Sequence, residues 1–481
     1  MSYLADVMTW FPSFLARLRT WRLAVLYLCY ALPGGCFLLV ATPPFQTPDA
    51  ANHFFRATQV AQGGWLAKSF SGTSGGPIDD GASDFAAIFD PIAHHPEVKL
   101  TTSMNERGRL IRWSGENRAA EFPNTAIYPA YGYAPQALAI AFGRAFNASV
   151  RATYVAACAA GLLGSVALTA WAIALARRTA LALFAIASLP CTAMLFSSVS
   201  QDATVVPLCF LLIAFADRSI DEGVPVSPRA LVLMALGCGL VVSARPPYAG
   251  LLLLMFAPGL RIDATRYAFV RRLVWFGATA AAAAFAALFF SRAGWAPVAP
   301  PRSLGGQLDY LSHAPLQIVH IVIATLNAYG GFYFASFVGV LGWLDASFRH
   351  GYYTLAMLMF AALALASALP ADVQRASRAA DRGAAVAVFA VSTAMIFGSL
   401  YLTWTPVGNA VVEGVQGRYF LALAPLLALA MPAPAARGSR NLSVQGRSAR
   451  GARALCVVIV LAFPFVTFIE LVDLILHRYY L

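Results

Sequence analysis

Long apolar runs alternate with short polar segments along most of this chain. Several runs are about 20 residues long and nearly free of charge, which is enough to cross roughly 30 Å of hydrocarbon as a helix. They are Leu23–Ala41, Ala152–Ala176, Leu273–Phe290, Tyr352–Leu369, Ala384–Trp404 and Ala454–Leu474. No alternation of period two suggests a barrel, and lipid offers no partner to an open backbone. The pattern therefore predicts an all-α polytopic membrane protein.

Shorter apolar runs are predicted to form two hairpins. Ala180–Val199 and Thr204–Ala216 meet at SQDA, and Leu231–Ser243 and Tyr248–Leu260 meet at ARPPY. The segment 315–345 is apolar enough to span, but counting it as a crossing would move five arginines near the C-terminus to the outer side. We expect it to be re-entrant or interfacial, with Gly330–Gly331 as a turn. With a further run ending near residue 430, the pattern predicts about eleven spans.

Composition and charge agree with this topology. Of the 481 residues, 59% are hydrophobic and 12% are charged, and the mean hydropathy is +0.66, whereas soluble domains are about half apolar and a quarter charged. The net charge of +12 could suggest a nucleic-acid partner. However, 19 of the 34 basic residues fall in segments assigned to the inside, among them the basic cytoplasmic loop 433–453. This bias follows the positive-inside rule, so it predicts a cytoplasmic N-terminus, an outer C-terminus and no nucleic-acid partner.

One segment between the spans is much longer than a connection. Residues 43–147 follow the first span, carry both lysines and are predicted to lie outside the membrane. A segment of this length is expected to fold and to carry function. Its final part, IYPAYGYAPQ, is interpreted as a surface segment rich in tyrosine and proline. Apart from this loop, 1–481 is expected to form a single transmembrane domain.

Several familiar signatures are missing or incomplete. All seven cysteines lie in apolar runs without paired spacing, which favours small buried hydrophobes over disulfides or a metal site. LPGGC resembles a lipoprotein cleavage box, but Pro33 and the continuing apolar run favour a retained span. His94–His95 has no further ligand at metal spacing. With lysine only at Lys68 and Lys99, no phosphate-binding loop ending in GK exists, which argues against an ATP-driven machine.

The stretch TPDAANHFFRA directly after the first span carries the densest candidate chemistry. Thr47 is a suitable N-cap and Pro48 suits the first helical position, which places Asp49 in the first turn. Asp49, His53 and Arg56 then share one helix face. The helix N-terminus favours an ionised Asp49, which suits a general base or a metal ligand. The alternative is that Asp49 only complements the helix dipole while His53 and Arg56 meet lipid headgroups.

Other polar residues gather at the predicted outer ends of spans. They are Asp202, Arg245 with Tyr248, Trp343 with Asp345, and Glu413 with Arg418. Each has a simpler explanation: Asp202 could cap a helix, Arg245 and Arg418 could snorkel, and Trp343 could belong to the aromatic belt. Their coincidence on one face nevertheless predicts a substrate-binding site at the outer surface, to which His53, Arg56 and Tyr248 would also contribute. Charges at mid-span, which usually mark ion coupling, are nearly absent.

PDAANHFFRA, SVSQDA, ARPPY, GVLGWLD and VQGRYF resemble, in this order, the landmarks of a bacterial membrane family known as domain of unknown function 2142 (DUF2142). That family is similar to the GT-C superfamily of glycosyltransferases, and the resemblance extends roughly from Pro43 to Ala430. It implies a GT-C-like enzyme of the bacterial inner membrane that transfers a sugar from a polyprenyl-phosphate donor, at the periplasmic face, to an acceptor hydroxyl of a cell-envelope glycan or lipid. Asp49 matches the catalytic acid, Asp202 a supporting acid, and Arg245 and Arg418 match basic positions suited to the lipid-linked phosphate.

Metal dependence and two rival functions stay open from the sequence. The family usually carries a second acid next to the first, and Ala50 stands there instead. The resemblance therefore implies no certain cofactor, and a divalent metal is only an alternative. A flippase or transporter of lipid-linked sugars would need a continuous polar path through the spans. A non-catalytic subunit of polysaccharide assembly would not need converging acids and bases.

Overall fold

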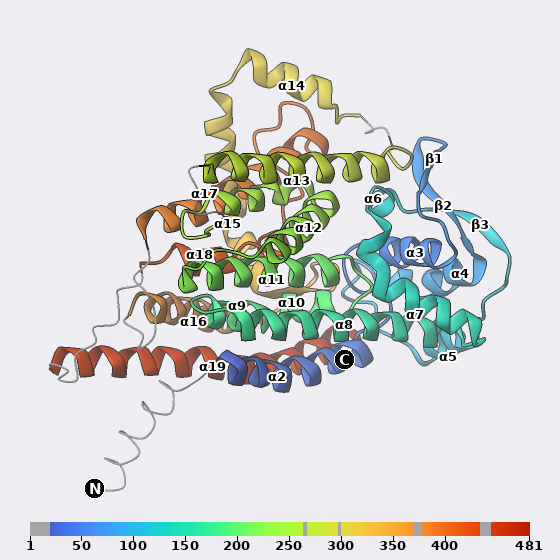
Figure 1. Ribbon diagram of the computed structural model, residues 1–481. Helices are drawn as coiled ribbons and strands as arrows, with labels where there is room; N and C mark the ends of the chain where they lie inside the picture. The colour runs from blue at the N-terminus through green and yellow to red at the C-terminus, as the bar shows by residue number, and fades with distance from the viewer. Residues whose placement is uncertain (1–19, 263–266, 297–299, 370–377, 433–443) are drawn as a thin grey trace, which may run out of the picture.

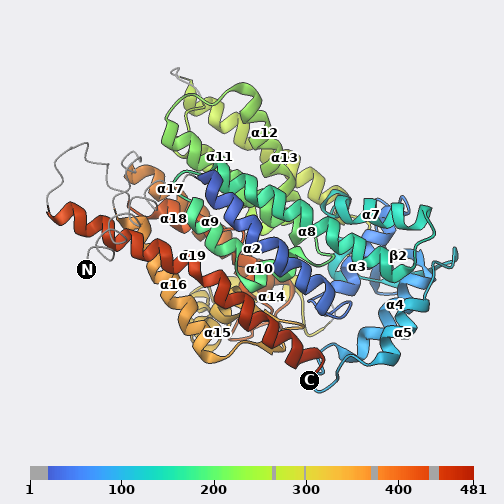
Figure 2. The ribbon, with the colours of Figure 1, turned by 90° about the horizontal axis from the view of Figure 1, so that it is seen from below.

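The computed structural model describes residues 20–262, 267–296, 300–369, 378–432 and 444–481. Long helices run side by side through most of the molecule, and the small helices and strands between α2 (Thr20–Ala41) and α8 (Val150–Leu175) gather at one end (Figure 1). We call this the first-loop end. The view turned by 90° shows the same separation (Figure 2).

Eight helices in these described ranges are long and apolar enough to cross a membrane. Besides α2 and α8 they are α11 (Asp202–Glu222), α13 (Ala268–Ser291), α15 (Gln317–Gly339), α16 (His350–Ala368), α17 (Ala379–Thr403) and α19 (Val444–Tyr479). This confirms the prediction of a helical polytopic membrane protein. The predicted count of eleven spans is not reproduced.

The remaining predicted spans are shorter or broken. In their place lie α9 (Ala180–Ala187), α10 (Pro190–Phe196), α12 (Pro228–Ala244), the 3-10 helices η3 (Pro246–Phe256) and η4 (Gly417–Phe420), and α18 (Pro425–Ala430). Several of these begin with a proline in the first turn, as α10 does with Pro190 and η3 with Pro246. Proline cannot donate the hydrogen bond that would continue the preceding helix, so each such proline starts a new short element.

The segment 315–345 differs from its predicted form. α15 continues without interruption through Gly330–Gly331, so the predicted turn there is wrong. The chain before α14 and the chain directly after α15 nevertheless contact the first-loop end. Before it, beyond the short helix α14 (Leu304–His313), the carbonyl of Trp295 accepts a hydrogen bond from Ser69. After it, Trp343 Nε1 donates to the carbonyl of Phe45 at 3.0 Å. That the segment is re-entrant or interfacial stays a prediction.

The segment between α2 and α8 is folded. It contains α3 (Ala50–Ala61), α4 (Asp80–Phe89), η1 (Asp90–Ile92), α5 (Thr102–Leu110), α6 (Pro123–Ala126), η2 (Ala130–Tyr133) and α7 (Ala134–Ala145), with strands β1 (Lys68–Phe70), β2 (Thr73–Asp79) and β3 (Asn117–Glu121). The strands form an antiparallel sheet in the order β1-β2-β3, with Lys68 opposite Gly75 and Asp79 opposite Asn117. A second, two-stranded sheet joins β4 (Val340–Leu341) to β5 (Ala346–Ser347).

The sequence pattern did not predict these strands. β2 reads TSGGPID, which lacks the alternation and the branched residues that mark a strand. The glycines have a steric reason: a Cβ on Gly75 would lie 1.9 Å from the carbonyl oxygen of Ala120 on the neighbouring strand. Close backbone approach therefore replaces side-chain packing on this part of the sheet.

An aromatic cluster attaches the first-loop end to α8. The Tyr154 ring lies 4.7 Å from that of Phe45 and 5.3 Å from that of Phe54, measured between ring centroids. The Tyr154 hydroxyl also accepts a hydrogen bond from the backbone N–H of Phe45 at 3.1 Å. These contacts fix the chain on both sides of Asp49 relative to a candidate membrane span.

Two further sequence predictions concern cysteines and the basic loop. All seven cysteines are free; five are buried as expected, whereas Cys29 and Cys36 are exposed on α2. Of the predicted loop 433–453, residues 433–443 lie outside the described residues, and residues 444–453 form the beginning of α19.

Candidate functional site

Asp49 adopts a conformation that the sequence did not predict. α3 begins at Ala50, so Asp49 precedes the helix instead of lying in its first turn, and Thr47 contributes only its carbonyl, to the N–H of Ala50 at 3.1 Å. Asp49 has a left-handed backbone with φ of 61°, and its side chain caps no helical N–H. Aspartate and asparagine tolerate this region better than most residues. The carboxylate is therefore free to point away from the helix.

Two side chains far along the chain hold this carboxylate. Asn124 Nδ2 donates to Oδ1 at 3.0 Å, and Arg418 Nη2 donates to Oδ2 at 3.2 Å. Burial alone would raise the pKa of Asp49, but the charge of Arg418 and these hydrogen bonds outweigh burial, so the pKa lies below its ordinary value. Asp49 is thus ionised at neutral pH.

Arg418 is positioned by a close contact between backbones. Gly417 lies so near α15 that a Cβ there would be 2.0 Å from the backbone nitrogen of Phe337. The N–H of Gly417 also donates to Ser336 Oγ at 2.9 Å. The Arg418 side chain is only 7% exposed, and its Nε is buried without a hydrogen-bond partner. A buried guanidinium with a spare donor is costly unless something else binds it.

A second acid–arginine pair has the same character. Arg245 Nη2 lies 2.6 Å from Asp202 Oδ1, and Asp202 is the first residue of α11. Arg245 Nη1 donates to the hydroxyl of Tyr128 at 2.9 Å, and the guanidinium lies 4.9 Å from the centre of that ring. The Nε of Arg245, like that of Arg418, is buried without a partner.

His53 is near enough to both pairs to feel their charges. Its Nδ1 is 2.7 Å from the Tyr133 hydroxyl, and its ring is nearly parallel to that of Tyr128, at 15°. The charges of both acids and both arginines act on it. Burial dominates and lowers the pKa of His53 to about 4, so the imidazole is neutral at neutral pH. We call Asp49, His53, Asp202, Arg245 and Arg418 the acid–arginine cluster.

Arg56 and Tyr248 have their polar groups directed elsewhere. Arg56 is fully buried and donates all five of its N–H groups, to the side chain of Gln59 and to the carbonyls of Gly64, Trp65 and Tyr128. Burial lowers its pKa to about 10, so it stays charged. The Tyr248 hydroxyl donates to the carbonyl of Tyr419 at 2.9 Å. Both residues hold the chain around the cluster, and that they also bind substrate directly stays a prediction.

Three residues that contact the cluster were missed in the sequence. Asn124, Tyr128 and Tyr133 come from the segment leading into α7. The interpretation of IYPAYGY as a surface segment was wrong, because Tyr133 is fully buried. The density of tyrosines in a loop beside candidate charges was the available signal, since a buried hydroxyl needs a partner.

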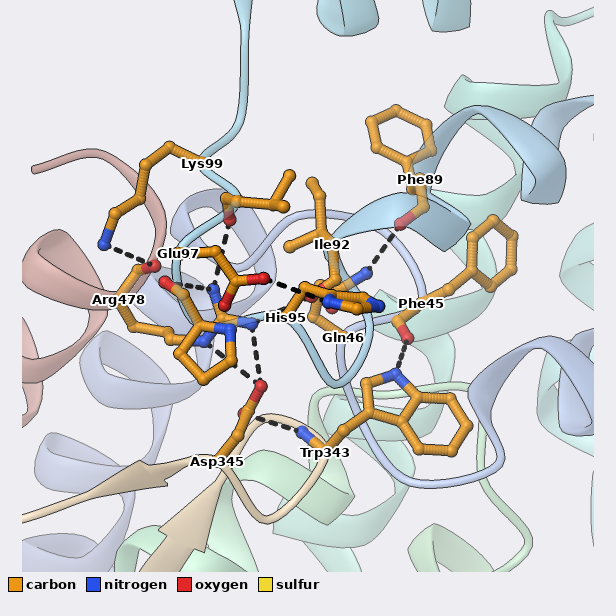
Figure 3. A network of polar contacts seen from close by, with 12 residues as sticks. Phe45, Gln46, Phe89, Ile92, His95, Glu97, Lys99, Trp343, Asp345 and Arg478 are labelled. Atoms are coloured by element: carbon orange, nitrogen blue, oxygen red, sulfur yellow. Dashed lines mark hydrogen bonds and ion pairs between the residues drawn. The ribbon is translucent and has the colours of Figure 1, made fainter.

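Other candidates belong to a separate network at the same end (Figure 3). Arg478, near the end of α19, donates to Asp345 Oδ2 at 2.7 Å and to the carbonyls of Ile92, Pro96 and Val98. Asp345 in turn accepts from the N–H of Trp343 at 3.1 Å. We call Asp345, Arg478 and the chain from Ile92 to Leu100 the clasp, because Lys99 and Leu100 also bond to carbonyls at the end of α19.

Glu413 and the histidine pair also lie apart from the cluster. Glu413 Oε1 accepts a hydrogen bond from Asn409 at 2.8 Å. His95 Nδ1 lies 3.0 Å from Glu97 on an exposed surface, and the His94 ring is 4.6 Å from that of Trp343. Neither feature contributes a group to the cluster.

The donor groups of the cluster suit an anion better than a cation. Each of its two carboxylates is already paired with an arginine. Within the ranges that the structure describes, no group of three or more His, Cys, Asp or Glu side chains is arranged to hold a metal ion. The spare capacity lies in guanidinium N–H groups, which prefer phosphate or carboxylate oxygens.

These features define a polytopic helical membrane protein with a buried acid–arginine cluster at one end. The profile of a family described as a predicted membrane protein, DUF2142, matches residues 34–427. The chain belongs to this family. No curated protein and no solved structure matches it.

Proposed function

We propose that this protein is a membrane glycosyltransferase of GT-C type that moves a sugar from a polyprenyl-phosphate donor to an acceptor hydroxyl of a cell-envelope glycan or lipid, at the periplasmic face of the bacterial inner membrane. The observation that carries the proposal is the convergence of two acid–arginine pairs, each with a buried and unpartnered guanidinium Nε, around a neutral histidine. This cluster combines groups for holding a phosphate with a carboxylate that can take a proton.

The two arginines would stabilise the departing phosphate. In the transfer, the bond between the sugar C1 and the phosphate oxygen breaks, and negative charge grows on the polyprenyl phosphate. Guanidinium groups match phosphate oxygens in charge and geometry. Because the donor already carries a phosphate leaving group, the reaction needs neither nucleotide nor ATP.

Asp49 would act as the general base, under the control of Arg418. Paired with Arg418, the carboxylate is ionised but weakly basic, whereas a base works best with a pKa near the working pH. A donor phosphate that takes N–H groups of Arg418 would weaken this pair and raise the pKa of Asp49. The acceptor hydroxyl would then lose its proton to Asp49 as its oxygen attacks C1 from the side opposite the phosphate, which inverts the anomeric carbon.

The decisive variant is Asp49→Asn. Asparagine also tolerates a left-handed backbone, so the variant is expected to fold, but it cannot accept the proton. We expect donor binding to persist and transfer to fall by at least about 10²-fold, the lower end for a positioned base. The assay follows polyprenyl-phosphate sugars by mass spectrometry, in liposomes that contain the purified protein and lipid extract from the producing cells. Asp473→Asn, at an exposed pair on α19, is the matched control.

Two outcomes would replace the proposal. If the wild-type protein moves the donor between leaflets without consuming it, the protein is a flippase or transporter. If it neither consumes nor moves the donor, the cluster serves a non-catalytic subunit. Normal transfer by Asp49→Asn would leave an enzyme whose base lies elsewhere.

The proposed face can be tested separately by labelling. In a cysteine-free background, Ser103→Cys on α5 and Ser448→Cys on α19 introduce thiols at exposed positions at the two ends of the molecule. The charge bias predicts that a membrane-impermeant thiol reagent applied to spheroplasts labels Ser103→Cys and reaches Ser448→Cys only after permeabilisation. Labelling of both variants from the same side would overturn the predicted orientation.

A further inference from the structure

A cavity of about 330 Å³ lies among α2, α8, α10 and α19. No charged side chain lines it, and most of its wall is aliphatic or aromatic. Three prolines border it, namely Pro33 within α2, Pro190 at the start of α10 and Pro464 within α19. A proline ring keeps the preceding helical turn at a distance. The three prolines therefore explain why space is left here, where straight helices would pack against each other.

The cavity opens to the outside between two candidate membrane spans. Cys29 and Pro33 of α2 are exposed at its edge, and so are Phe465 and Ile469 of α19, at 63% and 69%. α2 and α19 lie side by side in both ribbon views (Figure 2). The lining residues occupy the middle part of α2, so the medium at this opening is the hydrocarbon of the bilayer.

The cavity is separate from the acid–arginine cluster. α10 directs Pro190, Ala193 and Phe196 to the cavity, whereas the charges of Asp202 and Arg418 act on Cys191 of the same helix. α8 also has two different sides: Leu162 lines the cavity, and the neighbouring Gly161 faces the carbonyl of Ser198 and the side chain of Gln136. α10 therefore lies between the apolar cavity and the charged cluster.

We propose that this cavity binds one hydrocarbon chain of a membrane phospholipid, as a site distinct from the acid–arginine cluster and independent of the proposed transfer reaction. Its size is at the lower end of small-molecule pockets, which begin at about 300 Å³. An apolar cavity of roughly half this size stays dry and binds benzene. A chain restores the dispersion contacts that the wall atoms lack. The charged headgroup stays outside, since no charged side chain lines the cavity to pair with it.

The test uses phosphatidylcholine with a diazirine in the middle of one acyl chain, reconstituted with the full chain. Labelled peptides are mapped by mass spectrometry after illumination. We expect stronger labelling of the cavity residues of α2 and α19 than of the exposed face of α13, represented by Val274 and Phe285. Labelling no stronger than on α13 would mean ordinary lipid contact and would overturn the proposal.

A cavity-filling variant makes the test specific. A Cβ on Gly34 would have only Phe468 within 4 Å, at 4.0 Å, so Gly34→Leu directs a side chain into the space. It should reduce cavity labelling several-fold, while Gly277→Leu on α13, where nothing lies within 4 Å, should not. Ala193→Leu fills the cavity from α10 and replaces Gly34→Leu if that variant does not fold. Undiminished labelling in a folded filled variant would overturn the proposal.

A second probe distinguishes the source of the chain. The same diazirine is placed in a polyprenyl phosphate and offered at equal membrane concentration. Similar or weaker labelling than with the phospholipid supports a general lipid site. Strong preference for the polyprenyl phosphate would show that the cavity belongs to the transfer site, and the proposal of a separate lipid site would then be wrong.

Discussion

Two regions at the first-loop end contain buried acid–arginine pairs. They differ in how many of the arginine N–H groups have a hydrogen-bond acceptor. In the clasp, all five N–H groups of Arg478 donate to Asp345 or to backbone carbonyls. In the acid–arginine cluster, Arg245 and Arg418 each keep a buried Nε without a partner. Of these three arginines, the sequence singled out only Arg245 and Arg418, as basic residues at the outer ends of spans.

The difference separates a structural role from a binding role. A guanidinium that donates every N–H to the chain has no capacity for a ligand, so the clasp holds the end of α19 against the first-loop end (Figure 3). A buried guanidinium with spare donors has lost its hydrogen bonds to water without replacing all of them. A ligand that accepts these donors would complete the arrangement, which is why we propose a binding role for the cluster and a structural role for the clasp.

Breaking the clasp should have the largest effect on stability. The side chains of Asp345 and Arg478 are 11% and 4% exposed, so Asp345→Ala leaves a buried charge unpaired and should cost about 3–5 kcal/mol of unfolding free energy. Asp473→Ala removes an equally short pair with Arg349, in which the aspartate and arginine side chains are 39% and 72% exposed, and should cost much less because water screens an exposed pair. Unfolding of both variants in mixed micelles measures the difference. Equal costs would remove the structural assignment of the clasp.

Removing the Arg418 guanidinium, which has an unpartnered Nε, should have the next largest effect. This effect should be on activity and not on folding. Arg418→Ala should reduce transfer by about 10²-fold, as loss of one donor to a developing anion does elsewhere. Because Asp49 is 27% exposed, water can solvate its carboxylate and the variant should fold. Arg418→Lys should recover only part of the rate, since a point charge replaces a planar fork. Arg349→Ala, at an exposed pair, is the control; unchanged transfer in Arg418→Ala would contradict a phosphate role.

The sequence predicted the composition of the cluster better than its geometry. Apolar runs revealed the long helices, because length and absence of charge decide membrane insertion locally. Asp49, His53, Asp202, Arg245 and Arg418 were found because charges are conspicuous in an apolar chain. Their pairing was not predictable, since Asp49 and Arg418 meet only after the chain has folded.

Three features escaped prediction for physical reasons. Arg56 matched a binding residue by helical spacing, but the carbonyls that occupy its donors come from loops whose path no periodicity reveals. The left-handed backbone of Asp49 moved the start of α3 by two residues, a boundary detail that local signals rarely fix. Gly330–Gly331 was interpreted as a turn, yet a buried or lipid-facing helix can continue through glycine at modest cost.

The smallest expected effect is a dependence of folding stability on pH, which comes from His53 in the acid–arginine cluster. His53 is buried in the cluster with its pKa lowered from 6.5 to about 4. Between these values the unfolded chain binds a proton that the folded protein does not, so stability falls as pH falls from about 6.5 toward 4, with a slope of up to about 1.4 kcal/mol per pH unit. Above pH 6.5 both states are neutral at this residue, and the slope from His53 vanishes.

His53→Gln keeps a polar side chain beside Tyr133 without titrating, so the difference between wild type and variant should show this slope and no other. His95→Gln is the matched control, since His95 is 59% exposed, and it should retain the wild-type slope. Thermal unfolding in detergent between pH 7 and pH 4.5 measures all three proteins. If His53→Gln keeps the wild-type slope, water reaches His53 in the folded protein, and the burial of this residue in the cluster is contradicted.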